Sequence, residues 1–310
     1  MNLFEVNQFG QCQQSNNLPK ISIVTPSYNY GRFIEETITS VFKQNYPDLE
    51  YFIIDGQSND NTVDIIRKYE HHLTDWVSEP DGGAPDAIEK GFKKCTGELF
   101  NWLNADDWLF PGSLWAVGST AKHFPDYDIY ALLGANAGPL GLVLPSKPYL
   151  PQQHLYYSLM SNRSLFAQES TFVRRLFLIE NHININKSFS NIFDTVMYEE
   201  MLLKNARVLF INVLGGAIRH HPQAKTSKGL SHQEYETYQK WEKRNFTTIQ
   251  RSWRRFSKTR FHIFQQWICN YSPARKFTET VLKQKPKSAA ICTLVQWDPR
   301  DRDAWRVEHL

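Results

Sequence analysis

Short apolar runs alternate with amphipathic segments along the first 125 residues of the chain. The apolar runs are bounded by Pro, Gly, Asp and Asn, which is typical of buried strands. The segments between them repeat apolar residues at intervals of three and four positions, which predicts helices packed on a sheet. This β-α-β-α-β-α-β order predicts an α/β fold with a parallel sheet and right-handed crossovers. The expected strands are 21–25, 51–54, 76–77 and 99–103, and the expected helices are 32–44, 60–69, 84–95 and 114–124.

The pattern is less regular in the rest of the chain. The proline-rich residues 145–151 are typical of a connection, and residues 288–310 are expected to form an irregular extension. Further elements are expected between these two segments. The pattern predicts strands at 168–173 and 208–213 and a helix at 193–206.

Acidic residues stand at the ends of three of the expected strands. These are Asp55, Asp81 and Asp106. The carboxyl ends of parallel strands lie along one edge of a sheet, which is where α/β proteins usually bind their ligands. We therefore expect the three carboxylates to converge on one site.

Residues 104–107, Asn-Ala-Asp-Asp, form an acidic turn directly after the fourth expected strand. Two adjacent carboxylates repel each other unless a cation or a hydrogen-bond donor compensates. Such oxygen ligands suit Mg²⁺ or Mn²⁺, and these ions in turn suit a diphosphate. The alternative is a purely structural turn, since Asn and Asp are common turn residues. Because the chain lacks glycine-rich phosphate loops, phosphate charge would be met mainly by metal and basic side chains.

Composition narrows the class of protein. A hydrophobic content of 41% in 310 residues is enough for a large core. Four scattered cysteines without metal-ligand spacing indicate a reducing compartment. The polar start of the chain lacks the apolar run of a signal peptide, and no run of about eighteen apolar residues could span a membrane. We expect a cytoplasmic protein.

Charge is distributed unevenly along the chain. Residues 240–287 carry thirteen Lys and Arg against two acidic residues, a local charge of +11, whereas the whole chain carries +3, so the remainder carries −8. Between 246 and 267 apolar and basic residues alternate near helical spacing, which is typical of a helix lying on an anionic membrane surface. The alternative is a helix packed on the body of the protein with its basic side in solvent. The acidic remainder and the absence of binding motifs argue against nucleic acid as a partner.

Five segments together resemble the family 2 glycosyltransferases, which have the GT-A fold. The resemblance covers about residues 20–228 and implies a mostly parallel sheet flanked by helices. Together with the charge pattern, it divides the chain into a polar leader at 1–19, a catalytic domain at 20–230 and a helical, basic, amphipathic C-terminal region at 231–310. The catalytic domain has a donor half at about 20–125 and an acceptor half at about 126–230. The matching segments are Thr-Pro-Ser-Tyr-Asn at 25–29 and residues 55–62, 81–91, 102–107 and 168–175.

The resemblance implies roles for residues of the donor half. Asp55 would accept a hydrogen bond from uracil N3–H, although an Asp there can also simply cap a turn. Asn104 would contact ribose or a metal-bound water, and Lys90 would contact phosphate or lie on a solvated face. The other residues implied to line the donor site are Thr25, Pro26, Tyr28, Asp81, Ala105 and Lys225.

The same resemblance implies a metal site and a general base. Asp106 and His221 would bind Mn²⁺ or Mg²⁺, and Asp107 would be a second ligand or only support the loop. Asp194 aligns with the Asp that deprotonates the acceptor hydroxyl in the family. The surrounding sequence departs from the family pattern, so the adjacent pair at 199–200, Glu-Glu, is a rival assignment.

The implied function is inverting, metal-dependent transfer of a hexosyl or N-acetylhexosaminyl group from a nucleoside diphosphate, expected to be UDP. The acceptor would be a glycan or a lipid-linked glycan in surface polysaccharide biosynthesis. The enzyme would be cytoplasmic, or peripheral on the inner face of the cell membrane through residues 240–287. Two alternatives are a catalytically degenerate binding subunit and a sugar nucleotidyltransferase, which would need the phosphate loop that the chain lacks.

Overall fold

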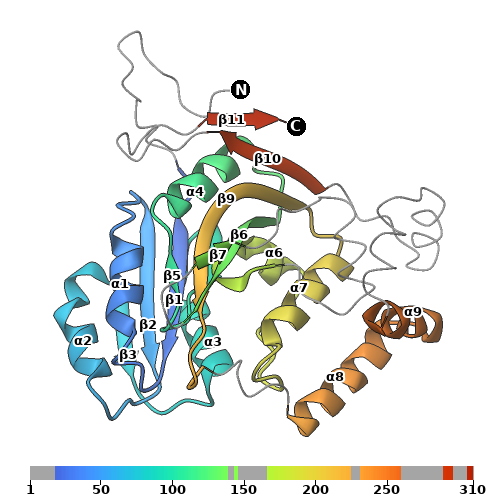
Figure 1. Cartoon of the computed structure of the whole chain (residues 1–310), viewed down its shortest axis with the longest axis horizontal. Coiled ribbons are helices and arrows are strands. Elements are labelled where there is room, and N and C mark those ends of the chain that lie inside the picture. The colour runs from blue at the N-terminus through green and yellow to red at the C-terminus, as the bar shows by residue number, and fades with distance from the viewer. Residues whose placement is uncertain are drawn as a thin grey trace.

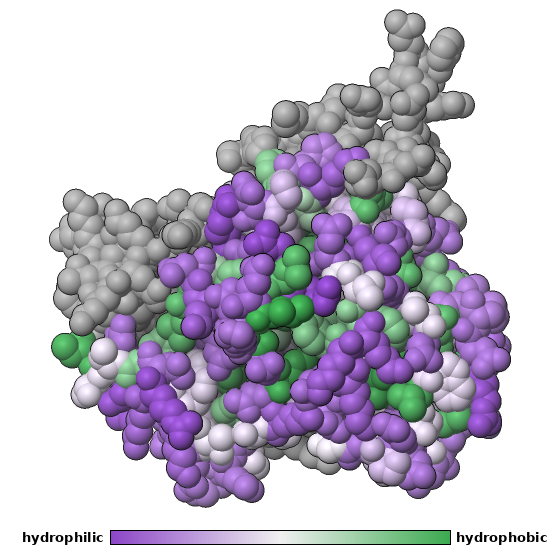
Figure 2. Space-filling model, turned by 180° about the vertical axis from the view of Figure 1, so that it is seen from behind, coloured by the Kyte–Doolittle hydropathy of each residue, from purple (hydrophilic) through white to green (hydrophobic). Residues whose placement is uncertain are grey.

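The structure is a computed structural model that describes residues 18–138, 143–145, 166–224, 231–259, 289–295 and 306–309. None of the helices in these ranges has the length and the apolar content needed to span a bilayer. Seen from behind, the described surface is mostly hydrophilic, with apolar side chains gathered toward its middle (Figure 2).

Four parallel strands form the first half of the sheet, in the order β4-β1-β2-β3. β1 lies between β2 and β4, and Ile21 pairs with Leu49 on one side and with Leu99 on the other. The predicted parallel α/β arrangement is therefore confirmed. The elements are β1 (Ile21–Ser27), α1 (Ile34–Phe42), β2 (Leu49–Asp55), α2 (Thr62–Lys68), η1 (Glu70–His72), β3 (Asp75–Ser78), α3 (Ala84–Lys94), β4 (Leu99–Trp102) and α4 (Ser113–His123).

The second half extends the sheet beyond β4 and mixes strand directions. β8 is antiparallel to both β4 and β6, and the long curved strand β9 runs parallel to β6 (Figure 1). The pairing of β6 with β9 shifts register around Leu133. The elements are β5 (Trp108–Leu109), β6 (Ile129–Ala137), β7 (Val143–Pro145), η2 (Gln168–Ser170), β8 (Thr171–Arg174), α6 (Arg175–Glu180), α7 (Phe193–Leu203), β9 (Val208–Arg219), α8 (His232–Asn245) and α9 (Thr248–Thr259).

The end of the chain differs from the prediction. An irregular extension was expected for residues 288–310, and this prediction is wrong for two segments. β10 (Ala289–Val295) pairs with β9, and β11 (Arg306–His309) pairs with β10. All seven residues of β10, Ala-Ala-Ile-Cys-Thr-Leu-Val, suit a buried strand, so a local signal was present.

Helices cover both faces of the sheet, and β1 shows why. All seven of its residues are buried, and successive side chains point to opposite faces. Ile23 belongs to the core formed with α1, α2 and α4, whereas Val24 belongs to the core formed with α3, α6, α7 and α8. A strand buried on both sides reads as a continuous apolar run, which is the pattern at 21–24.

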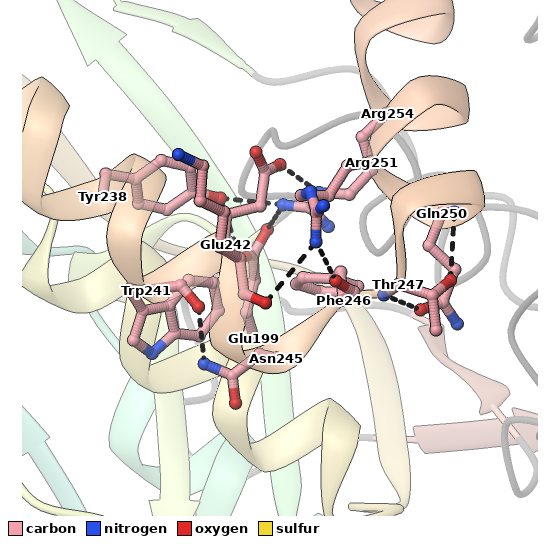
Figure 3. Close-up of polar contacts among 11 residues, drawn as sticks. Glu199, Tyr238, Trp241, Glu242, Asn245, Phe246, Thr247, Gln250, Arg251 and Arg254 are labelled. Carbon is pink, nitrogen blue, oxygen red and sulfur yellow. Dashed lines mark hydrogen bonds and ion pairs between the residues drawn. The ribbon is translucent and has the colours of Figure 1, made fainter.

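The helix α7 lies between the sheet and the pair formed by α8 and α9 (Figure 1). Arg254 of α9 is only 1% exposed, and its guanidinium donates to Glu199 of α7 and Glu242 of α8, both at 2.8 Å (Figure 3). It also donates to the Tyr238 hydroxyl at 2.7 Å. Arg254 therefore does not belong to a basic face turned to solvent or membrane. The described part of this region favours a helix packed on the body of the protein.

Replacement of Arg254 by Met should destabilise the protein, because it leaves the buried Glu199 carboxylate without its cation. We expect Arg254→Met to lower the free energy of unfolding by about 3–5 kcal/mol. The matched control is Arg244→Met on the exposed end of α8, which should change it by less than about 1 kcal/mol. Urea denaturation measures both values, and equal losses in the two variants would contradict the role assigned to Arg254.

Candidate active site

The acidic turn (residues 104–107) is fixed to helix α1. The Thr37 hydroxyl is within hydrogen-bond distance of two carbonyls, Ala105 at 2.9 Å and Asp107 at 2.7 Å. Inside the turn, the Asp107 amide donates to the Asn104 carbonyl at 3.0 Å. Ala105, predicted to contact the donor, is buried with its carbonyl turned to Thr37. The turn is thus a rigid platform at the end of β4.

The two carboxylates of the acidic turn have different surroundings. Asp107 is 3% exposed, and its two oxygens accept hydrogen bonds from the Arg219 amide and from the Asn104 side chain, each at 3.0 Å. Burial, together with the charges of Asp106 and Glu169, raises the pKa of Asp107 well above its usual value. These contacts favour the second of its predicted roles, which is to support the loop.

Asp106 is paired with His221, 115 residues further along the chain. The His221 Nε2 atom lies 2.9 Å from an Asp106 carboxylate oxygen. The His221 ring packs on Phe33 with 4.5 Å between centroids, and Tyr30 meets its edge at 6.5 Å. Burial, the charge of Asp106 and a hydrogen bond to it raise the pKa of Tyr30 above its usual range. Tyr30 and Phe33 were not predicted as site residues, because only tertiary packing brings them to the turn.

The side chains of Asp106 and His221 could serve as ligands of a divalent cation. One carboxylate and one imidazole are present, and within the described residues the buried Nδ1 of His221 has no hydrogen-bond partner. The described ranges hold no group of three His, Cys, Asp or Glu side chains that could enclose a metal ion. Mg²⁺ is usually held by one or two protein carboxylates together with substrate phosphates, so two protein ligands are compatible with such a site.

Arg219 connects strand β9 to the acidic turn. Its Nε atom donates to the Asp106 carbonyl at 3.0 Å, and its guanidinium also pairs with Glu36 of α1. The same guanidinium lies over the Trp108 ring, 4.5 Å from the centroid. Arg219 therefore joins β9, the acidic turn and α1 at one point, and it brings a positive charge to the acidic turn.

The residues predicted to bind the nucleotide lie along the neighbouring strand ends. Asp55 is fully buried, and it accepts hydrogen bonds from the Ser58 amide at 2.8 Å and the Ser78 hydroxyl at 2.7 Å. It therefore caps the turn after β2, and its contact with a base stays a prediction. A Cβ placed on Gly56 would meet the Asp81 carboxylate at 3.0 Å, so the ends of β2 and β3 touch.

The remaining predicted donor contacts are divided between buried and exposed positions. Thr25 is fully buried against the Tyr51 hydroxyl at 3.0 Å, and Pro26 is buried beside it, whereas Tyr28 is 57% exposed. Lys90 lies on α3, and its ammonium group pairs at 2.8 Å with Glu79 in the loop between β3 and α3. Lys225 lies outside the described residues.

Asp194 lies in the first turn of α7 and its carboxylate accepts a hydrogen bond from the Thr195 amide at 2.7 Å. Burial raises its pKa to about 6, with a smaller contribution from Glu234. The rival residues face the other way: Glu199 binds Arg254, and Glu200 accepts a hydrogen bond from the Trp241 indole at 2.8 Å. These contacts favour Asp194 over Glu199 and Glu200 as the base.

Glu169 is a buried acid that the sequence analysis missed. It is fully buried on η2, and within the described residues its Oε2 atom has no hydrogen-bond partner. Burial raises its pKa to about 7, and the charge of Asp194 adds to the shift. The neighbouring Gln168 contacts the Asn104 side chain at 3.3 Å. The only sequence signal was its place in the segment 168–175.

Comparison with known sequences locates the part of the chain that relatives share. The family model described as Glycosyl transferase family 2 matches residues 22–180. An uncharacterized glycosyltransferase of Rickettsia typhi is 28% identical over 142 residues, which cover 44% of each chain. The putative teichuronic acid biosynthesis glycosyltransferase TuaG of Bacillus subtilis is 36% identical over 98 residues, 30% of this chain and 38% of TuaG. The chain thus spans less than half the length of these curated relatives.

Solved structures share the architecture. S. aureus TarS 1–349 in complex with UDP-GlcNAc matches with a TM-score of 0.57 at 19% identity, covering 70% of this chain and 64% of that one. The mannosyltransferase PcManGT from Pyrobaculum calidifontis, in complex with GDP-Man and Mn²⁺, matches with a TM-score of 0.52 at 16% identity, covering 86% and 85%. At these identities the likeness shows the fold alone, and it confirms the predicted GT-A sheet flanked by helices.

The buried acid Glu169 should make the protein less stable at high pH. Its folded pKa of about 7 lies above the value of 4.5 expected in the unfolded chain. The stability that it contributes is therefore fully present below pH 4.5 and is lost as the pH rises through 7. We expect the free energy of unfolding of Glu169→Gln to exceed that of the wild type by about 3 kcal/mol at pH 8. The difference should vanish near pH 4.5.

Urea denaturation across this pH range, in chelator, measures the difference. Glu180→Gln, at an exposed position of α6, is the control and should differ from the wild type by the same small amount at every pH. A stability difference between Glu169→Gln and wild type that does not change with pH would refute the assignment.

Proposed function

The chain belongs to glycosyl transferase family 2, and we propose that it transfers a sugar from a nucleoside diphosphate to a hydroxyl group of a glycan or lipid-linked acceptor. The observation that carries this proposal is the pairing of Asp106 with His221 at the carboxyl end of β4, on the same sheet edge as Asp55 and Asp81. A donor nucleotide bound along this edge would place its diphosphate beside the acidic turn.

The finer assignments rest on comparison and chemistry. We propose UDP as the donor nucleotide, in keeping with the UDP-GlcNAc complex of TarS, although PcManGT was solved with GDP-Man. The name of TuaG supports a role in surface polysaccharide synthesis. We also propose that the chain belongs to a subgroup with Asn-x-Asp-Asp in place of Asp-x-Asp, because Asn104 donates to Asp107 and so supports the turn.

The donor side of the mechanism depends on Asp106 and His221, which would hold Mn²⁺ or Mg²⁺, with Lys225 as a proposed phosphate contact. A divalent cation bound there would neutralise the negative charge that grows on the departing diphosphate. Arg219 and Thr37 both hold backbone carbonyls of the turn in place, so the carboxylate of Asp106 needs little rearrangement when the donor binds.

The acceptor side of the mechanism depends on Asp194. The acceptor oxygen forms a bond to the anomeric carbon while the bond from that carbon to the diphosphate oxygen breaks. The hydroxyl proton moves to the Asp194 carboxylate, and attack opposite the leaving group inverts the anomeric configuration. A pKa of about 6 suits this task, because the carboxylate is ionised at neutral pH and is more basic than an ordinary Asp.

We also propose that the basic region at 240–287 meets an anionic membrane surface. In its described part Arg254 faces the body of the protein, whereas Lys243, Arg244 and Arg255 are exposed, and Ile249 is 65% exposed. Exposed basic and apolar side chains of this kind are typical of helices that lie on anionic lipid.

Transfer should require a divalent cation and Asp106. We expect Asp106→Asn to lower kcat about 100-fold or more, because the variant lacks the carboxylate that would hold the cation. EDTA should abolish wild-type transfer, and added Mn²⁺ or Mg²⁺ should restore it. Asp126→Asn, at an exposed position, is the matched control. Full activity of Asp106→Asn in excess chelator would refute the metal-dependent mechanism, and donor binding without turnover in the wild type would favour a binding subunit.

The pH dependence of transfer should report Asp194. Because the base must be ionised, we expect kcat to rise as the pH passes through about 6 and then to level off. Asp194→Asn should lose about 100-fold to 10,000-fold in kcat and lose this acid limb. Glu200→Gln tests the rival assignment and should keep both the rate and the limb. The opposite result for the two variants would transfer the role of base to Glu200.

A further inference from the structure

The N-terminal end of α7 is held by a carboxylate from another helix. Glu234 of α8 accepts hydrogen bonds at one oxygen from three successive backbone amides, Ser190 at 2.9 Å, Asn191 at 2.6 Å and Ile192 at 3.2 Å. Its other oxygen accepts from the Asn191 side chain at 2.9 Å and from the Ser190 hydroxyl at 3.2 Å. Five hydrogen bonds therefore converge on one side chain.

This contact anchors the segment that leads into α7, because the Ser190 and Asn191 amides precede the helix and Ile192 is its N-cap residue. The N-cap residue of α7, Ile192, has no side chain that could accept a hydrogen bond. The free amides at a helix start need acceptors, and a negative charge there is favoured by the helix dipole. Glu234 is 4% exposed; burial alone would raise its pKa, but the hydrogen bonds, above all that from the Asn191 amide, hold the pKa below its usual value. Glu234 is therefore an ionised side chain of another helix, α8, that anchors the chain as it enters α7.

The start of α8, which carries Glu234, is itself fixed by a side-chain cap. The Ser231 hydroxyl accepts a hydrogen bond from the Glu234 amide at 3.1 Å and so caps α8. Further along, α7 is bound to α9 by the Glu199–Arg254 pair and to α8 by the Glu200–Trp241 hydrogen bond (Figure 3). The two helices thus fasten α7 at its start and along its length.

The place of Asp194 follows from the place of this helix start. Asp194 is two residues beyond Ile192, and its carboxylate receives a hydrogen bond from Thr195, the next residue of α7. A shift of the N-terminal turn would move the carboxylate with it. Displacement of a catalytic group by about 1 Å can cost about 100-fold in rate.

We propose that Glu234 is a positioning residue that sets the place of Asp194 in the acceptor site, which makes α8 a part of the catalytic unit. The proposal rests on the proposed function of Asp194 as the base. It assigns a catalytic purpose to a segment that lies beyond the residues 22–180 matched by the family model.

Among the described residues, the charged groups that act on or sense Asp194 are Glu234 on α8 and Glu169 on η2. Both are acidic, and a nearby negative charge raises the pKa of a carboxyl group. Removal of the charge of Glu234 should therefore lower the pKa of Asp194. This gives a readout that a purely structural role would not change.

Three variants of the full chain test the proposal. Glu234→Gln removes the charge but keeps the size of the side chain. Glu234→Asp keeps the charge but moves the carboxylate oxygens away from the start of α7. Glu236→Gln is the matched control, because it makes the change from Glu to Gln at an exposed position of α8. We expect Glu234→Gln to lower kcat about 10-fold to 100-fold with the donor KM unchanged, and to shift the acid limb of kcat to lower pH. Glu234→Asp should lower kcat without shifting the limb, and Glu236→Gln should match the wild type.

Amide hydrogen exchange at residues 190–192 decides the structural half of the proposal without any assay of transfer. We expect exchange there to be at least about tenfold faster in Glu234→Gln than in wild type and unchanged in Glu236→Gln. Should Glu234→Gln not fold, Asn191→Ala removes a single one of the five hydrogen bonds and keeps the charge of Glu234. It should show faster exchange and a lower kcat on a smaller scale, without a shift of the acid limb.

The outcomes separate the two proposals. Unchanged exchange at 190–192 in Glu234→Gln, or wild-type kcat with an unshifted acid limb, overturns the positioning role. A wild-type protein that transfers no sugar, or an Asp194→Asn variant with full activity, overturns the proposed function instead. Faster exchange together with a lower kcat and a shifted limb supports both.

Discussion

The accumulation of negative charge in one buried region is the constraint on which the rest of the structure depends. The charges of Asp106 and Glu169 add to the effect of burial in raising the pKa of Asp107, and the charge of Asp194 adds in the same way to that of Glu169. Like charges in a poorly solvated place cost several kcal/mol unless donors or cations compensate. The surrounding structure supplies that compensation through backbone amides, an amide side chain, an imidazole and a guanidinium. These groups belong to Arg219, His221 and Asn104.

Local periodicity was sufficient to predict the first half of the sheet. The strands β1, β2 and β4 are buried on both faces and read as apolar runs, and α1 and α3 show helical spacing, so each is identified within a short window. β6 was not predicted because it contains Gly134 and Asn136 and does not alternate cleanly. β10 was missed although its apolar run is plain in the sequence, because the flanking charged residues suggested an extension.

The sequence predicted only those parts of the site that recognisable motifs mark. The acidic turn and Asp194 were found because motifs mark them in sequence order. Tyr30, Glu169 and Glu234 were not found, since each acts through a partner far away in the chain and no spacing relates the two. The pair at 199–200 was a rival only in sequence, because its side chains turn toward α8 and α9.

The distance in sequence between the acidic turn and its partners has a consequence for synthesis. Arg219 and His221 follow Asp106 by 113 and 115 residues, and Arg219 lies at the end of β9. Strands β1 to β4 are complete long before these residues leave the ribosome. A nascent chain therefore carries Asp106 and Asp107 without Arg219 and His221 for several seconds or longer at ordinary rates of about 5–20 residues per second. The hydrogen bonds that join the acidic turn to the end of β9 can form only after that interval.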